Sequence, residues 1–102
     1  MLPSAWVYIL TNKPRHTTLY VGSTIALPIR VWEHQTKRKP RSFSARYNVT
    51  TPVYIEPFEH IEDAIKRERY IKRKSRKWKE ALINKFNPEW RDLTEEIMSL
   101  YY

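Results

Sequence analysis

An acidic side chain stands out because it lies inside a strongly basic segment. Residues 61–74 have the periodicity of an amphipathic helix, whose apolar face, at about 100° per residue, carries Ile61, Ala64, Ile65 and Ile71. Glu68 falls near the middle of this face, where an unpaired carboxylate would be costly to bury. It is either a core glutamate paired with an arginine, or a metal ligand or acid–base group at a cleft. One carboxylate with several water molecules is the usual way in which Mg²⁺ is held beside a phosphate.

A second pair of polar residues lies on an expected helix over residues 27–35. Arg30 and His34 are four residues apart and share the side that also carries apolar residues. Each has an ordinary explanation, because arginine stems lie along apolar surfaces and a lone histidine is often a hydrogen-bonded core residue. Together with Glu68 they supply what phosphodiester cleavage requires: a cation for the phosphate charge, a metal ligand and a proton acceptor.

Two tyrosines are expected on neighbouring strands of one hairpin. Residues 6–10 and 17–21 are rich in β-branched and aromatic residues, and their short connection predicts an antiparallel pair. This pairing could bring Tyr8 and Tyr20 to one face of the sheet, although packing in the core would explain either of them. Gly22 ends the second strand and marks a positive φ or a close approach to the backbone.

The other segments complete the expected fold. We expect a loop over residues 36–48 with a short helical turn near 43–47, a third strand over 53–56, a helix over 61–74, a helix from Ser75 to residue 85 or 86, and a short final helix over 94–100. The order β-β-α-β-α-α predicts an α/β (α+β) fold, a three-stranded antiparallel sheet flanked by helices. Residues 1–93 would form the domain and 94–102 its C-terminal tail or short helix.

Composition excludes several kinds of chemistry. The chain has 102 residues, no cysteine and one glycine. These numbers exclude a disulfide scaffold, a thiolate zinc site, an iron–sulfur cluster, a cysteine nucleophile and the glycine-rich phosphate loops. No apolar run approaches the ~18 residues of a membrane span, and no signal-peptide pattern is present, so we expect no membrane association and a cytoplasmic location.

The charge points to a polyanionic partner. The formal net charge is +8; nine of the 19 basic residues lie among residues 66–79, and another five among residues 37–46. Lysine and arginine at this density attract nucleic acid through counterion release, although a solvated helix face is the alternative. The cations expected to contact nucleic acid are Lys37, Arg38, Lys39, Arg41, Arg46, Lys72, Arg73 and Arg76.

These residues, in this order, resemble the GIY-YIG nuclease superfamily, and in particular its small stand-alone bacterial members. The resemblance covers residues 6–93. Its first motif is at Trp6-Val7-Tyr8 and its second at Tyr20-Val21-Gly22; Arg30 and His34 match the next helix, Glu68 a later helix, and Asn87 the C-terminal segment. Trp6 and Val7 replace the glycine and isoleucine of the family name. Ile25 and Ala26 stand where related sequences carry Asn or Asp to start the helix, and Ile29 where they carry another arginine.

The resemblance implies a divalent-metal-dependent DNA endonuclease that acts in DNA repair or processing, with one Mg²⁺ or Mn²⁺ on Glu68. Tyr8 would be the general base for water, although ionising a tyrosine with a pKa near 10 costs about 4 kcal/mol at pH 7. Tyr20 would bind phosphate or water, Arg30 would stabilise charge, and His34 would shuttle a proton or orient Tyr8.

Gly22 and Asn87 would support this site. A protein partner could supply DNA specificity, since the resemblance does not extend to a separate DNA-binding domain. The alternative is a non-catalytic nucleic-acid-binding module that retains the GIY-YIG fold, with Tyr47 or Tyr54 stacking on bases.

Overall fold

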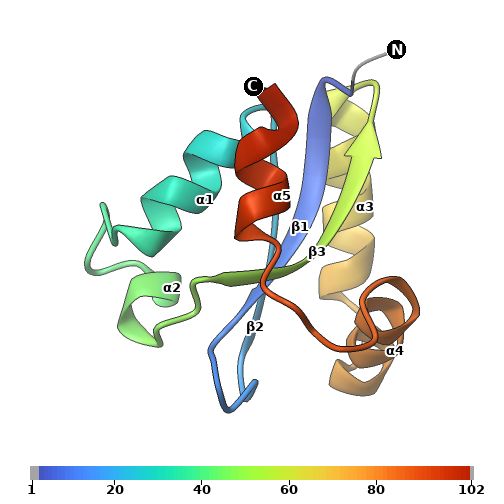
Figure 1. Cartoon of the computed structure of the whole chain (residues 1–102). Coiled ribbons are helices and arrows are strands. Elements are labelled where there is room, and N and C mark those ends of the chain that lie inside the picture. Colours follow the sequence, from blue (N-terminus) through green and yellow to red (C-terminus); the bar gives the residue numbers. More distant parts are fainter. Residues whose placement is uncertain (1–2, 102) are drawn as a thin grey trace.

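Three strands form one antiparallel sheet at the centre of the molecule (Figure 1). The computed structural model describes residues 3–101, without the side chains of residues 43, 44 and 101, so the first two residues of the expected domain and the last residue of its expected tail lie outside it. Strand β1 (Ala5–Thr11) is the middle strand and is buried throughout, as its continuous apolar run predicts. Strands β2 (Leu19–Thr24) and β3 (Thr51–Phe58) are the two edges.

Strand β2 differs from its expected range of 17–21. Its ladder with β1 runs from the pair Thr11–Leu19 to the pair Trp6–Thr24, so the strand begins and ends later in the chain. The prediction that Gly22 ends the strand is therefore wrong, because Gly22 lies inside β2, directly opposite Tyr8. The pairing partner sets the length of this strand, and a sequence pattern does not show where that partner ends.

Strand β3 is longer than the expected residues 53–56 and includes the prolines that were expected to bound it. Pro52 and Pro57 both lie within the strand, and the pairing with β1 shifts register between Ile9 and Leu10. A proline lacks the N–H that a strand donates, and an edge strand has one side on which that N–H is not needed. The edge position thus explains why two prolines are accommodated.

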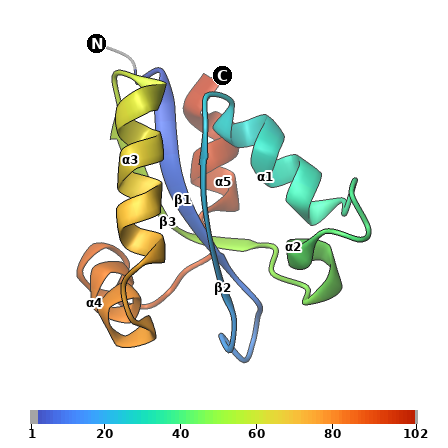
Figure 2. The ribbon, with the colours of Figure 1, turned by 180° about the vertical axis from the view of Figure 1, so that it is seen from behind.

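Helices cover both faces of the sheet (Figures 1 and 2). Helices α1 (Leu27–Gln35) and α5 (Thr94–Met98) pack on one face, and α3 (Ile61–Lys72) and α4 (Arg76–Phe86) on the other. Residues of β1 alternate between the two cores: one is formed with Ala5, Val7 and Ile9, the other with Trp6, Tyr8 and Leu10. Short helices α2 (Phe43–Arg46) and η1 (Ser99–Tyr101) complete the chain.

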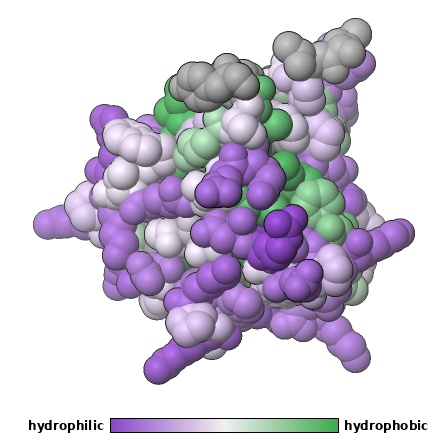
Figure 3. All heavy atoms as spheres, viewed as in Figure 1, coloured by the Kyte–Doolittle hydropathy of each residue, from purple (hydrophilic) through white to green (hydrophobic). Residues whose placement is uncertain are grey.

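The expected α+β fold with a three-stranded antiparallel sheet is confirmed. Ser75 caps α4, accepting a hydrogen bond from the Trp78 N–H at 3.1 Å, as the sequence indicates. The surface viewed in Figure 3 is dominated by hydrophilic side chains, with apolar ones gathered in a band across its upper half. Among the described residues, no helix combines the length and apolar character that crossing a membrane requires.

Candidate active site

Helix α1 brings Arg30 and His34 to the sheet. Leu27 and Val31 are fully buried and fix this helix against the face of β1 that carries Tyr8. No side chain caps the helix itself, but the Thr24 hydroxyl accepts a hydrogen bond from the backbone N–H of residue 26 at 3.0 Å. This bond at the end of β2 holds the entry to α1, where related sequences would carry Asn or Asp.

Three rings meet where α1 faces β1 and β2. The ring centroids of Tyr8 and Tyr20 are 6.2 Å apart, those of Tyr8 and His34 5.9 Å, and those of Tyr20 and His34 5.1 Å. Tyr8 Oη lies 3.2 Å from His34 Nε2, within hydrogen-bond distance. Tyr8 is almost completely buried, with 1% of its surface exposed. The structure therefore places the two tyrosines and the histidine together, on the face where the hairpin was expected to set the tyrosines.

The single glycine of the chain makes room for Tyr8. A Cβ atom at residue 22 would lie 2.5 Å from both Cζ and Oη of Tyr8. The φ angle of Gly22 is not positive, so of the two explanations open at the sequence level the close approach is the one that holds. The Tyr8 hydroxyl therefore extends across the backbone of β2 at residue 22, to the edge of the sheet.

Glu68 reaches the same edge from the other face. It lies on α3, and its Oε1 accepts a hydrogen bond from the hydroxyl of Ser23, the residue that follows Gly22. Its Oε2 lies 2.6 Å from Lys72 Nζ. The prediction of a core glutamate paired with an arginine is wrong, because the partner is a lysine with a half-exposed side chain. Glu68 keeps 18% of its side chain exposed and is not sealed in the interior.

The tyrosine hydroxyl is held in its protonated form. Burial, reinforced by neighbouring Tyr20, raises the pKa of Tyr8 above its ordinary value, and Arg30 offsets only part of this effect. The charge of Glu68 raises the pKa of Tyr8 further, so the carboxylate is close enough to act on that hydroxyl across the strand. By itself Tyr8 is therefore a poor general base.

The pKa values of His34 and Glu68 are lowered, whereas that of Tyr8 is raised. Burial and the positive charge of Arg30 lower the pKa of His34, so its imidazole is neutral at pH 7. Burial alone would raise the pKa of Glu68, but hydrogen bonds from Lys72 and Ser23 outweigh this and lower it. Glu68 is thus an anion at neutral pH, and His34 is the group that can accept a proton.

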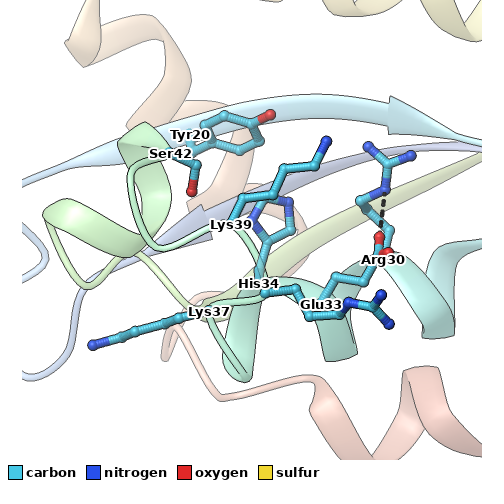
Figure 4. Close-up of a pocket in the computed structure, with 8 residues that line it drawn as sticks. Tyr20, Arg30, Glu33, His34, Lys37, Lys39 and Ser42 are labelled. Carbon is cyan, nitrogen blue, oxygen red and sulfur yellow. Dashed lines mark ion pairs between the residues drawn. The ribbon is translucent and has the colours of Figure 1, made fainter.

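A basic hollow opens beside the rings (Figure 4). It has a volume of about 500 Å³ and is lined by Tyr20, Arg30, Glu33, His34, Lys37, Arg38, Lys39 and Ser42. Figure 4 shows the ion pair between Arg30 and Glu33, whose Nε and Oε1 atoms are 3.3 Å apart. Three of the cations expected to bind nucleic acid line this hollow. Lys37, Arg38 and Lys39 therefore lie next to three of the predicted catalytic residues, Tyr20, Arg30 and His34.

The other expected cations are placed differently. Arg41 and Arg46 are exposed beyond the hollow, and Arg73 is exposed at the end of α3. Arg76 donates hydrogen bonds to the backbone carbonyls of residues 16 and 17 and pairs with Glu80. Arg76 is thus a brace between α4 and the β1–β2 connection rather than a free phosphate ligand.

Asn87 supports the fold at a distance from the rings. Its side-chain amide donates to the carbonyls of Val53 and Arg91, and its oxygen accepts from the Arg91 N–H at 3.1 Å. These bonds tie the end of α4 to β3, on the face opposite α1. Support of the site by Asn87 would therefore act through the packing of the sheet.

Sequence reasoning did not predict the two contacts of Glu68: Lys72 was expected only to contact nucleic acid, and Ser23 was not singled out. The sequence does carry a signal for the contact with Lys72, because a lysine four residues after a glutamate lies on the same side of a helix as that glutamate. Ser23 had none, since its contact with Glu68 spans 45 positions in the chain. Glu33 and Ser42 were also missed as part of the wall of the hollow.

The donor set fits a metal held mainly by water. Among residues 3–101 there is no group of three or more His, Asp or Glu side chains that could form a metal cage. At the edge formed by residues 22 and 23, Glu68 offers an anionic carboxylate that is still partly exposed. This fits the mode in which Mg²⁺ keeps several waters and binds one carboxylate beside a phosphate.

Comparison with known proteins identifies the class. Residues 4–87 match the GIY-YIG catalytic domain, and the chain belongs to this family, as its motifs predict. It thereby belongs to a superfamily of nucleases. The chain is 33% identical over 84 residues to a UPF0213 protein of Syntrophus aciditrophicus (strain SB). The aligned region covers 82% of this chain and 93% of that protein. No solved structure is significantly similar to the present chain.

Proposed function

We propose that the protein is a divalent-metal-dependent endonuclease that hydrolyses phosphodiester bonds in DNA, in DNA repair or processing. The observation that carries this proposal is the meeting of two groups at residues 22 and 23 of β2. The Tyr8, Tyr20 and His34 rings with Arg30 arrive from one face, and the Glu68 carboxylate arrives from the other. Ser23 and Glu68 are partly exposed, and Tyr20, Arg30 and His34 line the hollow, so a phosphate of a large polymer can approach both groups.

Neutral His34 is the proton acceptor in this proposal. With Nε2 unprotonated, it accepts the Tyr8 hydroxyl proton over 3.2 Å, which leaves a lone pair on Tyr8 Oη for the attacking water. The water passes its proton to Tyr8 as Tyr8 passes its own to His34. The water oxygen forms the new P–O bond, and the bond to the leaving oxygen breaks; the leaving oxygen keeps the bonding electron pair and takes a proton from solvent water.

Positive groups on both faces of β2 would stabilise the negative charge of the phosphate. Arg30 lines the hollow beside Tyr20 and keeps its positive charge at any working pH. A divalent cation bound by Glu68 would supply further positive charge at the scissile phosphate. Lys37, Arg38 and Lys39 then hold the neighbouring phosphates of the strand, and Arg41 and Arg46 extend this path.

The test is the isosteric substitution Glu68→Gln, assayed by nicking of supercoiled plasmid with Mg²⁺ or Mn²⁺. Glutamine keeps the acceptor oxygen for Ser23 but lacks the charge that holds a metal, so nicking should fall by at least about 100-fold. Binding of the same DNA without divalent ions should change little. Glu62→Gln, which alters an exposed carboxylate on the same helix, is the control and should nick at the wild-type rate. Equal nicking by wild type and Glu68→Gln would contradict the proposal.

A non-catalytic nucleic-acid-binding module is the second candidate. It is favoured by the engagement of both Glu68 oxygens, one with Ser23 and one with Lys72. Of the two aromatics expected to stack on bases, Tyr54 is buried and bonded to Glu56, so it is excluded, whereas Tyr47 is exposed. Tight DNA binding with no nicking by the wild type in Mg²⁺ or Mn²⁺ would establish this second function.

A further inference from the structure

The two partners of Glu68 differ in how firmly they are held. Ser23 belongs to β2, and both it and the residues before and after it in the chain are paired with β1. Lys72 is the last residue of α3, and half of its side chain is exposed. A lysine has a flexible four-carbon stem and is readily hydrated, so it can leave the carboxylate at small cost. The hydroxyl is therefore a fixed contact of Glu68 and the ammonium a movable one.

The ammonium contacts the carboxylate oxygen through which a divalent ion would bind. Lys72 Nζ is 2.6 Å from Oε2, while Oε1 is directed toward Ser23. A metal ion at contact distance from Oε2 would meet the lysine charge within a few ångströms, where like charges repel strongly at the low dielectric of a half-buried site. The two cations therefore compete for one oxygen atom.

We propose that Lys72 is the counter-ion that a divalent cation displaces from Glu68, while Ser23 keeps the carboxylate in place during the exchange. This inference rests on the proposed metal-dependent function. The displaced ammonium stays on the last turn of α3, where it becomes available to a phosphate. Lys72 and Ser23 are thus positioning residues with opposite effects on metal affinity.

The first experiment measures Mn²⁺ binding by isothermal titration calorimetry, without DNA. Lys72→Met removes the competing ammonium and should lower the Kd for Mn²⁺ by about fivefold, the upper range for an ion pair at a surface. Arg69→Met is the matched control, because Arg69 is another cation of α3 whose charge acts on Glu68. Losing this more remote charge should lower the Kd by no more than about twofold, since water and salt screen it.

The second experiment tests the fixed contact in the same titration. Ser23→Ala should raise the Kd for Mn²⁺ by about tenfold, because a hydrogen bond to a charged group is lost. Ser23→Thr keeps the hydroxyl and should restore the affinity. Thermal unfolding of each variant by circular dichroism shows whether β2 is intact. A purely structural role for Lys72 cannot explain tighter Mn²⁺ binding after its removal.

The outcomes of the two titrations separate the proposed exchange from the proposed metal-dependent function. An equal gain in affinity for Lys72→Met and Arg69→Met, or none for either, would overturn the proposed exchange while leaving metal-dependent cleavage intact. A total lack of Mn²⁺ binding by both wild type and Lys72→Met would overturn the exchange together with the metal-dependent function. The expected pattern is a gain with Lys72→Met, little change with Arg69→Met, a loss with Ser23→Ala and recovery with Ser23→Thr.

Discussion

A missing side chain at residue 22 decides where the Tyr8 hydroxyl lies. The ring occupies the space that a Cβ atom would fill, at 2.5 Å from its Cζ and Oη atoms. No other residue type leaves this space free. The Tyr8 hydroxyl can therefore lie over residue 22 of the edge strand, next in sequence to Ser23, which binds Glu68.

Gly22→Ala should accordingly destabilise the protein by about 2 kcal/mol, the usual cost of overpacking a rigid site. Urea denaturation measures this loss. The cost should shrink in a Tyr8→Leu background, where the distal part of the ring is gone, and the double-mutant cycle reports the difference. An unchanged cost in that background would show that Tyr8 is not the obstacle.

The lowered pKa of His34 has a consequence for stability that does not depend on function. The unfolded chain takes up a proton at His34 near pH 6.5, whereas the folded protein does so only at lower pH. As the pH falls through about 6.5, the unfolded state binds more protons and the free energy of unfolding decreases. Stability from this residue is present above that pH and is lost below it.

His34→Gln should therefore flatten this part of the pH dependence. Urea denaturation from about pH 7.5 to about pH 5 compares the two proteins, and the difference between them isolates His34 from other titrating groups. The wild type should lose more stability than the variant over this range. Parallel curves would mean that the imidazole is not desolvated in the folded state.

At the scale of elements, the loop between α3 and α4 sets where α3 ends. The expected helix over residues 61–74 ends at Lys72, and Ser75 begins α4 with an N-cap hydrogen bond. Arg76, the first residue of α4, then binds the carbonyls of residues 16 and 17. This turn therefore positions α4 against the β1–β2 connection, and it leaves Lys72 on the last turn of α3 beside Glu68.

Ser75→Ala should lower the free energy of unfolding by about 1 kcal/mol, because an N–H of the first turn loses its acceptor. Ser75→Asp supplies another good N-cap and should remain close to wild type. Thermal or urea unfolding monitored by circular dichroism checks both variants. A similar loss for the alanine and aspartate variants would argue against capping as the cause.

For the whole molecule, the two basic clusters flank the strand edge from different faces. Residues 37–39 border the hollow beside α1, while Lys72 and Arg73 lie at the end of α3. With a net charge of +8, the protein attracts a polyanion over much of its surface, and the hollow concentrates four cations next to Tyr20 and His34. Binding should therefore be strongly dependent on salt.

Lys39→Gln should reduce the slope of log K against log salt concentration by about one, because one phosphate contact is lost. Fluorescence anisotropy of a labelled oligonucleotide, without divalent ions, measures this slope. Lys85→Gln removes an exposed lysine of α4 and should leave the slope unchanged. A flat salt dependence of the wild type would instead favour protein contacts for both clusters.

The sequence by itself determined which side of each element the candidate site residues take. Helical and strand periodicities depend only on neighbouring residues, and they were sufficient to pair Arg30 with His34 and to place Glu68 on the inner face of its helix. The family motifs predicted the three-stranded fold, and the charge clusters predicted the polyanionic partner. These are properties of local order and composition.

Only the tertiary structure decided how the two halves of the site meet. Glu68 lies on the opposite face of the sheet from Tyr8, and the two approach each other because β2 is an edge strand. Strand order and the contact between Ser23 and Glu68 arise from pairings between distant segments, which no local pattern encodes. The same burial raises the pKa of Tyr8 and lowers that of His34, because desolvation disfavours the charged form of each.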